Sequence, residues 1–120
     1  MKIKHTVVAD TMVLRVSGMP SNRDMGVLLA EVERAVGSGN RHVVLNLADV
    51  TQMGAAGLGE LIKICAVVRA RHTRLTLSAV PHHIRYLLAV TNLSSFFETA
   101  DSDRDAIANA VTSKLRGQVA

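Results

Sequence analysis

The fold of this chain is decided by residues Val43 to Glu60, which read VVLNLADVTQMGAAGLGE. An apolar strand runs through a short polar turn into Gly54-Ala55-Ala56-Gly57 and then into an amphipathic helix. Such a junction exposes backbone N–H groups and the positive end of a helix dipole. A Ser or Thr here would suit phosphorylation, because the dipole stabilises the added negative charge. The chain carries Ala55 and Ala56 instead, so the junction has the geometry of a phosphorylation switch without its hydroxyl.

The segments before the junction predict a hairpin and a helix. Ile3 to Val8 and Met12 to Ser17 are β-prone and are separated by a short turn. A helix follows, capped by Ser21 or Asn22. Its apolar residues recur at helical spacing: Met25, Leu28, Leu29, Val32 and Val36.

The segments after the junction continue the alternation of helix and strand. The second helix has an apolar face, followed by a strand at Leu75 to Ala79 and a third helix with Pro81 in its first turn. Phe96 and Phe97 are expected to form a last short strand. A final helix, capped by residues 101–103, has Ile107, Val111 and Leu115 on its inner face. The order ββαβαβαβα predicts an α/β fold with a mixed sheet of about five strands and about four helices.

The amino-acid composition argues against several classes of function. The 120 residues fit one compact domain, and aromatic residues make up only 2%, which argues against base-stacking platforms. The net charge of +4 comes from scattered basic residues, so we expect no nucleic-acid partner. The single cysteine, Cys65, fits a reducing cytoplasm. No apolar run is long enough to predict a membrane span.

The order and spacing of these segments resemble a STAS domain, the fold of anti-sigma factor antagonists and of sulfate-transporter tails. The family pattern is an apolar strand, a turn, and then D-S-S-G-L-G opening a helix, which corresponds to residues 46–50 and 54–59 here. Later segments also resemble the family: Val80-Pro81, the helix from Ile84 to Leu88, and residues 91–93 before the two phenylalanines. The resemblance implies a single STAS-like domain over 1–120, with a core at about 3–112 and a helix end and tail at about 113–120.

The resemblance also implies a function, and this sequence departs from the family pattern at one functional position. The first serine of D-S-S-G, which a partner kinase phosphorylates in the family, falls on Ala55, and alanine offers no oxygen nucleophile. The family's binding surface carries over, so we expect a non-catalytic module that binds a serine-kinase-type anti-sigma factor constitutively through the start of the second helix. The expected partner-binding residues are Asp49, Thr51, Met53, Gly54, Ala55, Ala56, Gly57 and Glu60. Thr51 is an alternative phosphoacceptor, although a turn hydroxyl explains it equally well.

An alternative within the same family is a STAS scaffold subunit of a transporter or signalling assembly. Loss of the phosphorylation site suits a scaffold as well as it suits a constitutive antagonist. The sequence leaves homodimerisation open. Met19, Met25 and Met53 are assigned either to the core or to an adaptable interface.

Other kinds of site are disfavoured. The glycine run reads G-x-x-G-x-G without a following Lys-Ser or Lys-Thr, and Glu60 is expected to place a negative charge in the first helical turn, so we predict no nucleotide loop. His82 and His83 are adjacent and would point about 100° apart on a helix, which makes a poor metal chelate. Cys65 sits on an apolar face and is interpreted as a core residue. We therefore expect no catalytic residue, metal or cofactor.

Overall fold

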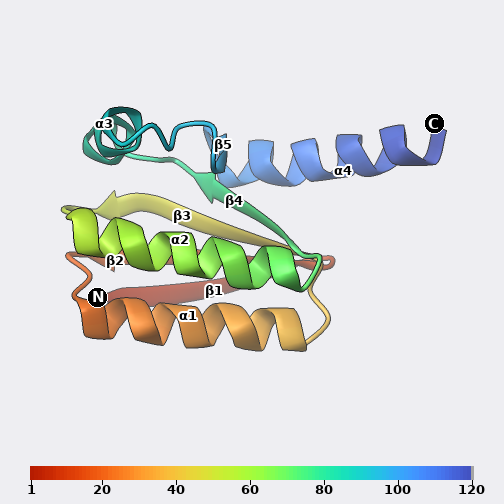
Figure 1. The fold of residues 1–120 in the computed structure, drawn as a ribbon. Coiled ribbons are helices and arrows are strands. Elements are labelled where there is room, and N and C mark those ends of the chain that lie inside the picture. The colour runs from red at the N-terminus through yellow and green to blue at the C-terminus, as the bar shows by residue number, and fades with distance from the viewer. Residues whose placement is uncertain (120) are drawn as a thin grey trace.

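A computed structural model describes residues 1–119, apart from the side chains of Asn22 and of residues 112–119. Within residues 1–119 the chain forms five strands and four helices in the predicted order ββαβαβαβα (Figure 1). The elements are β1 (Lys2–Val8), β2 (Thr11–Gly18), α1 (Asn22–Gly37), β3 (His42–Val50), α2 (Ala55–Ala70), β4 (Arg74–Ser78), α3 (His82–Val90), β5 (Glu98–Ala100) and α4 (Asp103–Val119).

The strands form a single mixed sheet in the order β1-β2-β3-β4-β5. β1 and β2 are antiparallel and are joined by a tight turn in which Ala9 has a positive φ of 55°. The other neighbouring pairs are parallel, because helices α1, α2 and α3 return the chain to the same edge of the sheet before each new strand. The mixed sheet predicted from the sequence is confirmed.

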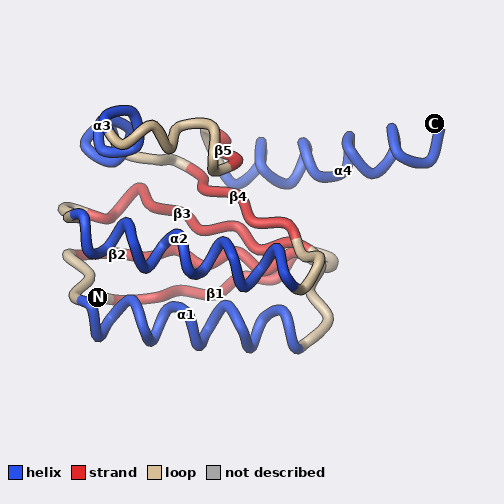
Figure 2. Tube along the Cα trace, in the orientation of Figure 1, coloured by secondary structure: helices blue, strands red, loops and turns tan. Residues whose placement is uncertain are grey.

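Helices α1 and α2 lie side by side across one face of the sheet (Figure 2). The main core lies beneath them, where Val43, Leu45 and Leu47 of β3 are at most 1% exposed. Val44 points to the opposite face and belongs to a second, smaller cluster with Ala106 of α4. β3 is therefore covered on both faces, as its nearly continuous apolar sequence predicts.

A layer of buried and half-buried polar side chains lies between the sheet and α4 and along the neighbouring strands. Asn46 donates from Nδ2 to both carboxylate oxygens of Asp103 at 3.1 Å, and Ser78 donates to the same carboxylate. Arg74 makes a bidentate ion pair with Glu98. These bonds join β3, β4 and β5 to one another and to the first turn of α4, and they satisfy polar groups that burial would otherwise penalise.

Three details of the sequence-based prediction are wrong. Phe96 and Phe97 precede β5 and are not part of it: their rings pack edge to face at 4.9 Å, and Arg69 lies over the Phe96 ring. Pro81 is the N-cap of α3 and lies just before its first turn. Val111, predicted on the inner face of α4, is 53% exposed and is not part of the core. The prediction for the Leu115 side chain lies outside the described residues.

Buried His42 gives the fold a pH dependence. Its side chain is 3% exposed, and burial, followed by the positive charge of Arg74, lowers its pKa below the ordinary value of 6.5. The charges of Glu98 and Asp10 oppose this shift. The neutral ring is favoured in the folded state, so the unfolded chain binds more protons below pH 6.5 and stability is lost as the pH falls through the lowered pKa.

We predict that His42→Gln removes part of this acid sensitivity. The amide nitrogen of Gln can replace the ring nitrogen that bonds Thr76, and Gln does not titrate. The free energy of unfolding, measured by urea denaturation from pH 8 to pH 5, should fall more steeply for the unmodified chain than for the variant. Parallel curves for the two proteins would contradict the assignment to His42, because the other histidines are common to both.

Candidate functional site

The junction between β3 and α2 is built at the carboxyl edge of the parallel strands. β3 ends at Val50, and α2 begins at Ala55 after four residues without regular structure. The N–H group of Thr51 donates to the carbonyl oxygen of Gly18 at 2.9 Å, which continues the pairing of β2 with β3 by one step. The end of β2 therefore holds the junction in place. We call residues 51–57 the junction surface.

Helix α2 begins without a side-chain cap. Its N-cap, Gly54, has an extended conformation (φ −96°, ψ −175°) and no side-chain hydrogen bond, and the first turn contains no acidic residue. Leu58 N–H donates to the carbonyl oxygen of Gly54 at 3.1 Å. Within the described residues, no acceptor is found for the N–H groups of Ala55, Ala56 and Gly57. Helix α1 differs, because Ser21 and Asp24 form a complete capping box at its start.

The exposed amides give the junction surface its chemistry. Ala55 and Ala56 are exposed and carry no polar atoms, so an oxygen acceptor from another molecule can approach the N–H groups without steric hindrance. The positive end of the helix dipole favours carbonyl or carboxylate oxygens at this place. The arrangement is suited to binding and provides no nucleophile at either alanine.

Glu60 does not lie where the sequence analysis expected it. Because α2 starts at Ala55, Glu60 falls in the second turn, half-buried and paired with Lys63 at 3.1 Å. Its charge therefore does not oppose an anion at the helix start. The prediction of no nucleotide loop now depends on the glycine spacing and on the missing Lys-Ser or Lys-Thr.

Met53 and Gly57 fit together in the first turn of α2. Met53 is half-buried and packs against the main core. A Cβ atom built on Gly57 would lie 2.9 Å from Met53 Cγ, closer than such atoms normally come. Gly57 is thus explained by close packing, which is the tight-turn role that the sequence predicts.

Asp49 is turned away from the helix start. It accepts a hydrogen bond from Arg15 Nε at 2.8 Å, and this bond holds the pKa of Asp49 below its ordinary range. Both side chains line a hollow of about 170 Å³ together with Lys2, Lys4 and Ser17. The structure therefore groups Asp49 with basic residues of β1 and β2.

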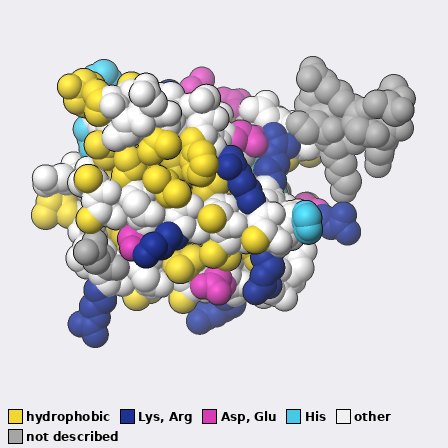
Figure 3. Space-filling view, in the orientation of Figure 1, with side chains coloured by type: hydrophobic (Ala, Val, Ile, Leu, Met, Phe, Trp, Pro, Cys, Tyr) yellow, Lys and Arg dark blue, Asp and Glu magenta, His cyan; other side chains and the backbone are white. Residues whose placement is uncertain are grey.

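Met19 and Met25, each predicted to lie either in the core or at an adaptable interface, have different surroundings in the structure. Met19 is 63% exposed and follows Gly18, which bonds the junction surface, whereas Met25 is fully buried. Hydrophobic side chains also gather on the surface between α2 and α3 (Figure 3), where half-buried residues come from both helices and the loop after α3. These residues are Ile62, Leu87, Leu93 and Phe96.

The other candidate groups are placed as follows. Cys65 is buried, as predicted, and burial raises the pKa of its thiol. His82 and His83 are exposed at the start of α3. In the part of the chain that the structure describes, no three metal-ligating side chains come together, and none of the helices is long and apolar enough to cross a membrane.

Comparisons with known proteins agree on one family. A family model described as "Mlab, STAS domain" matches residues 5–98. BtrV of Bordetella bronchiseptica, whose name gives it the proposed role of an anti-sigma factor antagonist, is 26% identical over 115 residues, which is 96% of this chain and 98% of BtrV.

Solved structures show the same fold. An anti-sigma factor antagonist from Mycobacterium paratuberculosis superposes with a TM-score of 0.77 at 19% identity, covering 90% of this chain and 92% of that one. The anti-sigma factor antagonist SpoIIAA, in its unphosphorylated form, superposes with a TM-score of 0.76 at 18% identity, covering 92% and 97%.

We predict that the effect of Gly57→Ala on stability changes sign with residue 53. Alanine is favoured over glycine within a helix by about 0.5–1 kcal/mol, but here its Cβ must displace Met53. Gly57→Ala should therefore destabilise the chain when Met53 is present and stabilise it by about 0.5–1 kcal/mol in a Met53→Ala background. Urea denaturation of the four proteins measures this coupling. An equal effect in both backgrounds would show that the contact carries no energy.

Proposed function

Because the chain belongs to the STAS domain family, we propose that it is a non-catalytic regulatory module that acts like an anti-sigma factor antagonist. Its partner in this proposal is a serine-kinase-type anti-sigma factor, which binds at the start of α2. BtrV and the M. paratuberculosis protein, both described as anti-sigma factor antagonists, support an anti-sigma factor as the partner, and its serine-kinase type is what the resemblance to the family implies.

The observation that carries the proposal is the uncapped and exposed start of α2. An unpaired amide in water has little cost, but the adjacent amides of the exposed residues Ala55 and Ala56 make a surface that another protein's oxygens can bind. The exposed Met19 and the hydrophobic surface between α2 and α3 extend this region with groups that favour protein contacts. Thr51, Met53 and Gly54 to Gly57 form its centre, with Asp49 and Glu60 at its margins.

Binding in this proposal is constitutive. SpoIIAA is known in an unphosphorylated and a phosphorylated form, so a protein of the same fold can carry phosphate. Ala55 stands at the position that resembles the family's phosphoserine and cannot accept a phosphoryl group. Regulation would then act on the amount of the protein or on its partner.

The proposal has consequences for where and how the chain works. We place it in the cytoplasm, where its single cysteine stays reduced, with residues 1–120 acting as one domain that contacts protein and not nucleic acid. A homodimer is compatible with the proposal.

A scaffold subunit of a transporter or signalling assembly is the second candidate. The matching family model is described as a STAS domain, so the family match fits this alternative as well as it fits the antagonist. Affinity purification from the native cell distinguishes the two. Recovery of a kinase-like or sigma-regulating protein supports the antagonist, whereas recovery of transporter subunits supports the scaffold.

We predict that Ala55→Glu weakens binding of the kinase-type partner at least tenfold. The carboxylate would occupy the amide site and place a charge where the partner's oxygens bind. Isothermal titration with the purified partner measures the change. The matched control is Ala30→Glu, which adds the same charge at an exposed position of α1. Equal weakening by both variants would show that net charge, and not the helix start, is responsible.

We predict that the double variant Gly54→Asp/Ala55→Ser becomes a substrate of the partner kinase. It restores the family's D-S-S-G pattern as far as the phosphorylated serine, and the acid can also cap α2. Incubation with the kinase and ATP, followed by mass spectrometry, should detect phosphate at residue 55 in the variant and none on the unmodified chain. Phosphate on Thr51 of the unmodified chain, with loss of binding, would overturn the constitutive model.

A further inference from the structure

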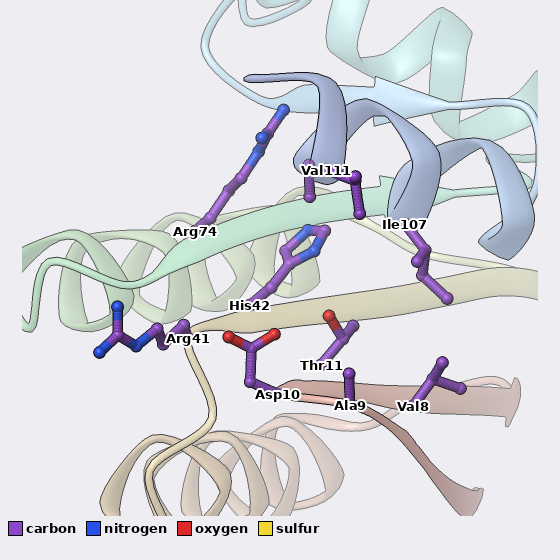
Figure 4. A pocket seen from close by; sticks show the side chains of 10 residues that line it. Val8, Ala9, Asp10, Thr11, Arg41, His42, Arg74, Ile107 and Val111 are labelled. Carbon is purple, nitrogen blue, oxygen red and sulfur yellow. The ribbon is translucent and has the colours of Figure 1, made fainter. Parts of the chain in front are cut away.

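A cavity lies at the sheet edge opposite the junction surface. It has a volume of about 690 Å³ and opens between the β1–β2 turn, the first residues of β3 and β4, and helix α4 (Figure 4). A volume of this size fits a small organic molecule. The junction surface lies at the far ends of the same strands, so nothing proposed for that surface uses this cavity.

The cavity has apolar walls. Val8 and Ala9 form one side, and Ile107, Ala110 and Val111 of α4 form the other. Val8 is 44% exposed and Val111 is 53% exposed, although both are apolar. Covering these walls with a hydrocarbon group would remove apolar surface from water.

The polar groups of the cavity include an acceptor without a donor. His42 contacts Thr76 Oγ1 through Nε2 at 2.8 Å, and Thr76 Oγ1 donates to Glu98 Oε1. We assign the proton of the neutral His42 ring to Nε2, because Thr76 Oγ1 donates to Glu98 and can then accept from His42; this tautomer leaves Nδ1 as an acceptor. Nδ1 is buried and has no hydrogen-bond partner in the described structure. A buried acceptor of this kind is costly and requires an explanation.

Two neighbouring groups are also available. Asp10 has no cation within ion-pair distance among the described residues, and its charge acts on His42. The Thr11 hydroxyl, on a side chain that is 4% exposed, makes no hydrogen bond to the described residues. Figure 4 shows the side chains of Asp10 and Thr11 beside each other, facing His42 and α4. A carboxylate, a hydroxyl and an imidazole ring with an unpaired nitrogen thus line one cavity.

The basic residues at the cavity do not satisfy these acceptors. Arg74 is held by Glu98. Arg41 lines the cavity, but Figure 4 shows its guanidinium directed away from Asp10 and His42. The missing partner is therefore a donor, and Asp10 favours one that carries a positive charge.

We propose that this cavity binds a small organic ammonium ion, whose N–H groups bond Asp10, Thr11 and His42 Nδ1 while its apolar body packs against Val8, Ile107 and Val111. An ammonium group has three donors and no acceptor, which matches three acceptors and avoids an unpaired lone pair. Specificity comes from the donor set, and affinity comes from the apolar walls and the charge of Asp10.

The test is an NMR titration with 2-phenylethylammonium as the probe. Phenylacetate and 2-phenylethanol share its ring but carry a negative charge or none, so they should bind at least tenfold more weakly. The ¹⁵N resonance of His42 Nδ1 should shift on titration, because that nitrogen gains a hydrogen bond. The proposal is overturned if no probe binds at millimolar concentration, or if the Nδ1 resonance does not move, since an ordered water then suffices as its partner.

Substitutions at Asp10 and Arg41 should change the affinity for the probe in opposite directions. Asp10→Asn, in an exposed turn, should weaken binding of the probe about tenfold, because a charged hydrogen bond becomes a neutral one. Arg41→Gln should strengthen binding about twofold, because a like charge leaves the cavity. Glu33→Gln on α1 matches the charge change of Asp10→Asn and should have no effect. Equal effects of Asp10→Asn and Glu33→Gln would contradict a specific role for Asp10.

Discussion

The burial of β3 on both faces is the constraint on which the rest of the structure depends. One face of this strand packs beneath α1 and α2, and the other lies under α4. A strand buried in this way must have nearly every side chain apolar or hydrogen-bonded. Asn46 meets the second condition, because its amide donates to Asp103 and its oxygen accepts from the N–H of Ala48. These bonds tie the middle of β3 to the first turn of α4.

The starts of α1 and α2 show how the chain uses helix ends differently. Ser21 and Asp24 satisfy the amides at the start of α1, so that end is closed to other molecules. At α2, Gly54 has no side chain to do this, although an Asp or Asn in its place would stabilise the helix by a few tenths of a kcal/mol. The amides remain available while Met53 packs beneath them. This small local cost is consistent with a surface kept free for a partner.

The sequence predicted what depends on local periodicity and missed what depends on distant contacts. Element order and the Ser21 cap follow from neighbouring residues, and both are as expected. The Phe96-Phe97 pair was assigned to a strand because two adjacent aromatic residues favour one, but Arg69 from α2 binds the Phe96 carbonyl and covers its ring. The cavity could not be predicted, because His42 and Thr76 are 34 residues apart and meet only through strand pairing. The pairing of Asp49 with Arg15 likewise depends on the contact between β2 and β3 and could not be predicted from the neighbouring residues.

The two ends of β3 are far enough apart to act separately. The strand has nine residues at about 3.3 Å each, so the cavity and the junction surface are separated by roughly 25 Å. This distance is several times the Debye length of about 8 Å at physiological ionic strength, so a charge bound near Asp10 does not act directly on the start of α2. Any coupling has to pass through the packing of β3. Side chains on both faces of the strand are close-packed, and no residue from His42 to Leu47 is more than 6% exposed. A rigid strand of this kind holds two sites in fixed positions, which allows a docking surface without a phosphorylation site to coexist with an independent ligand cavity in one small sheet.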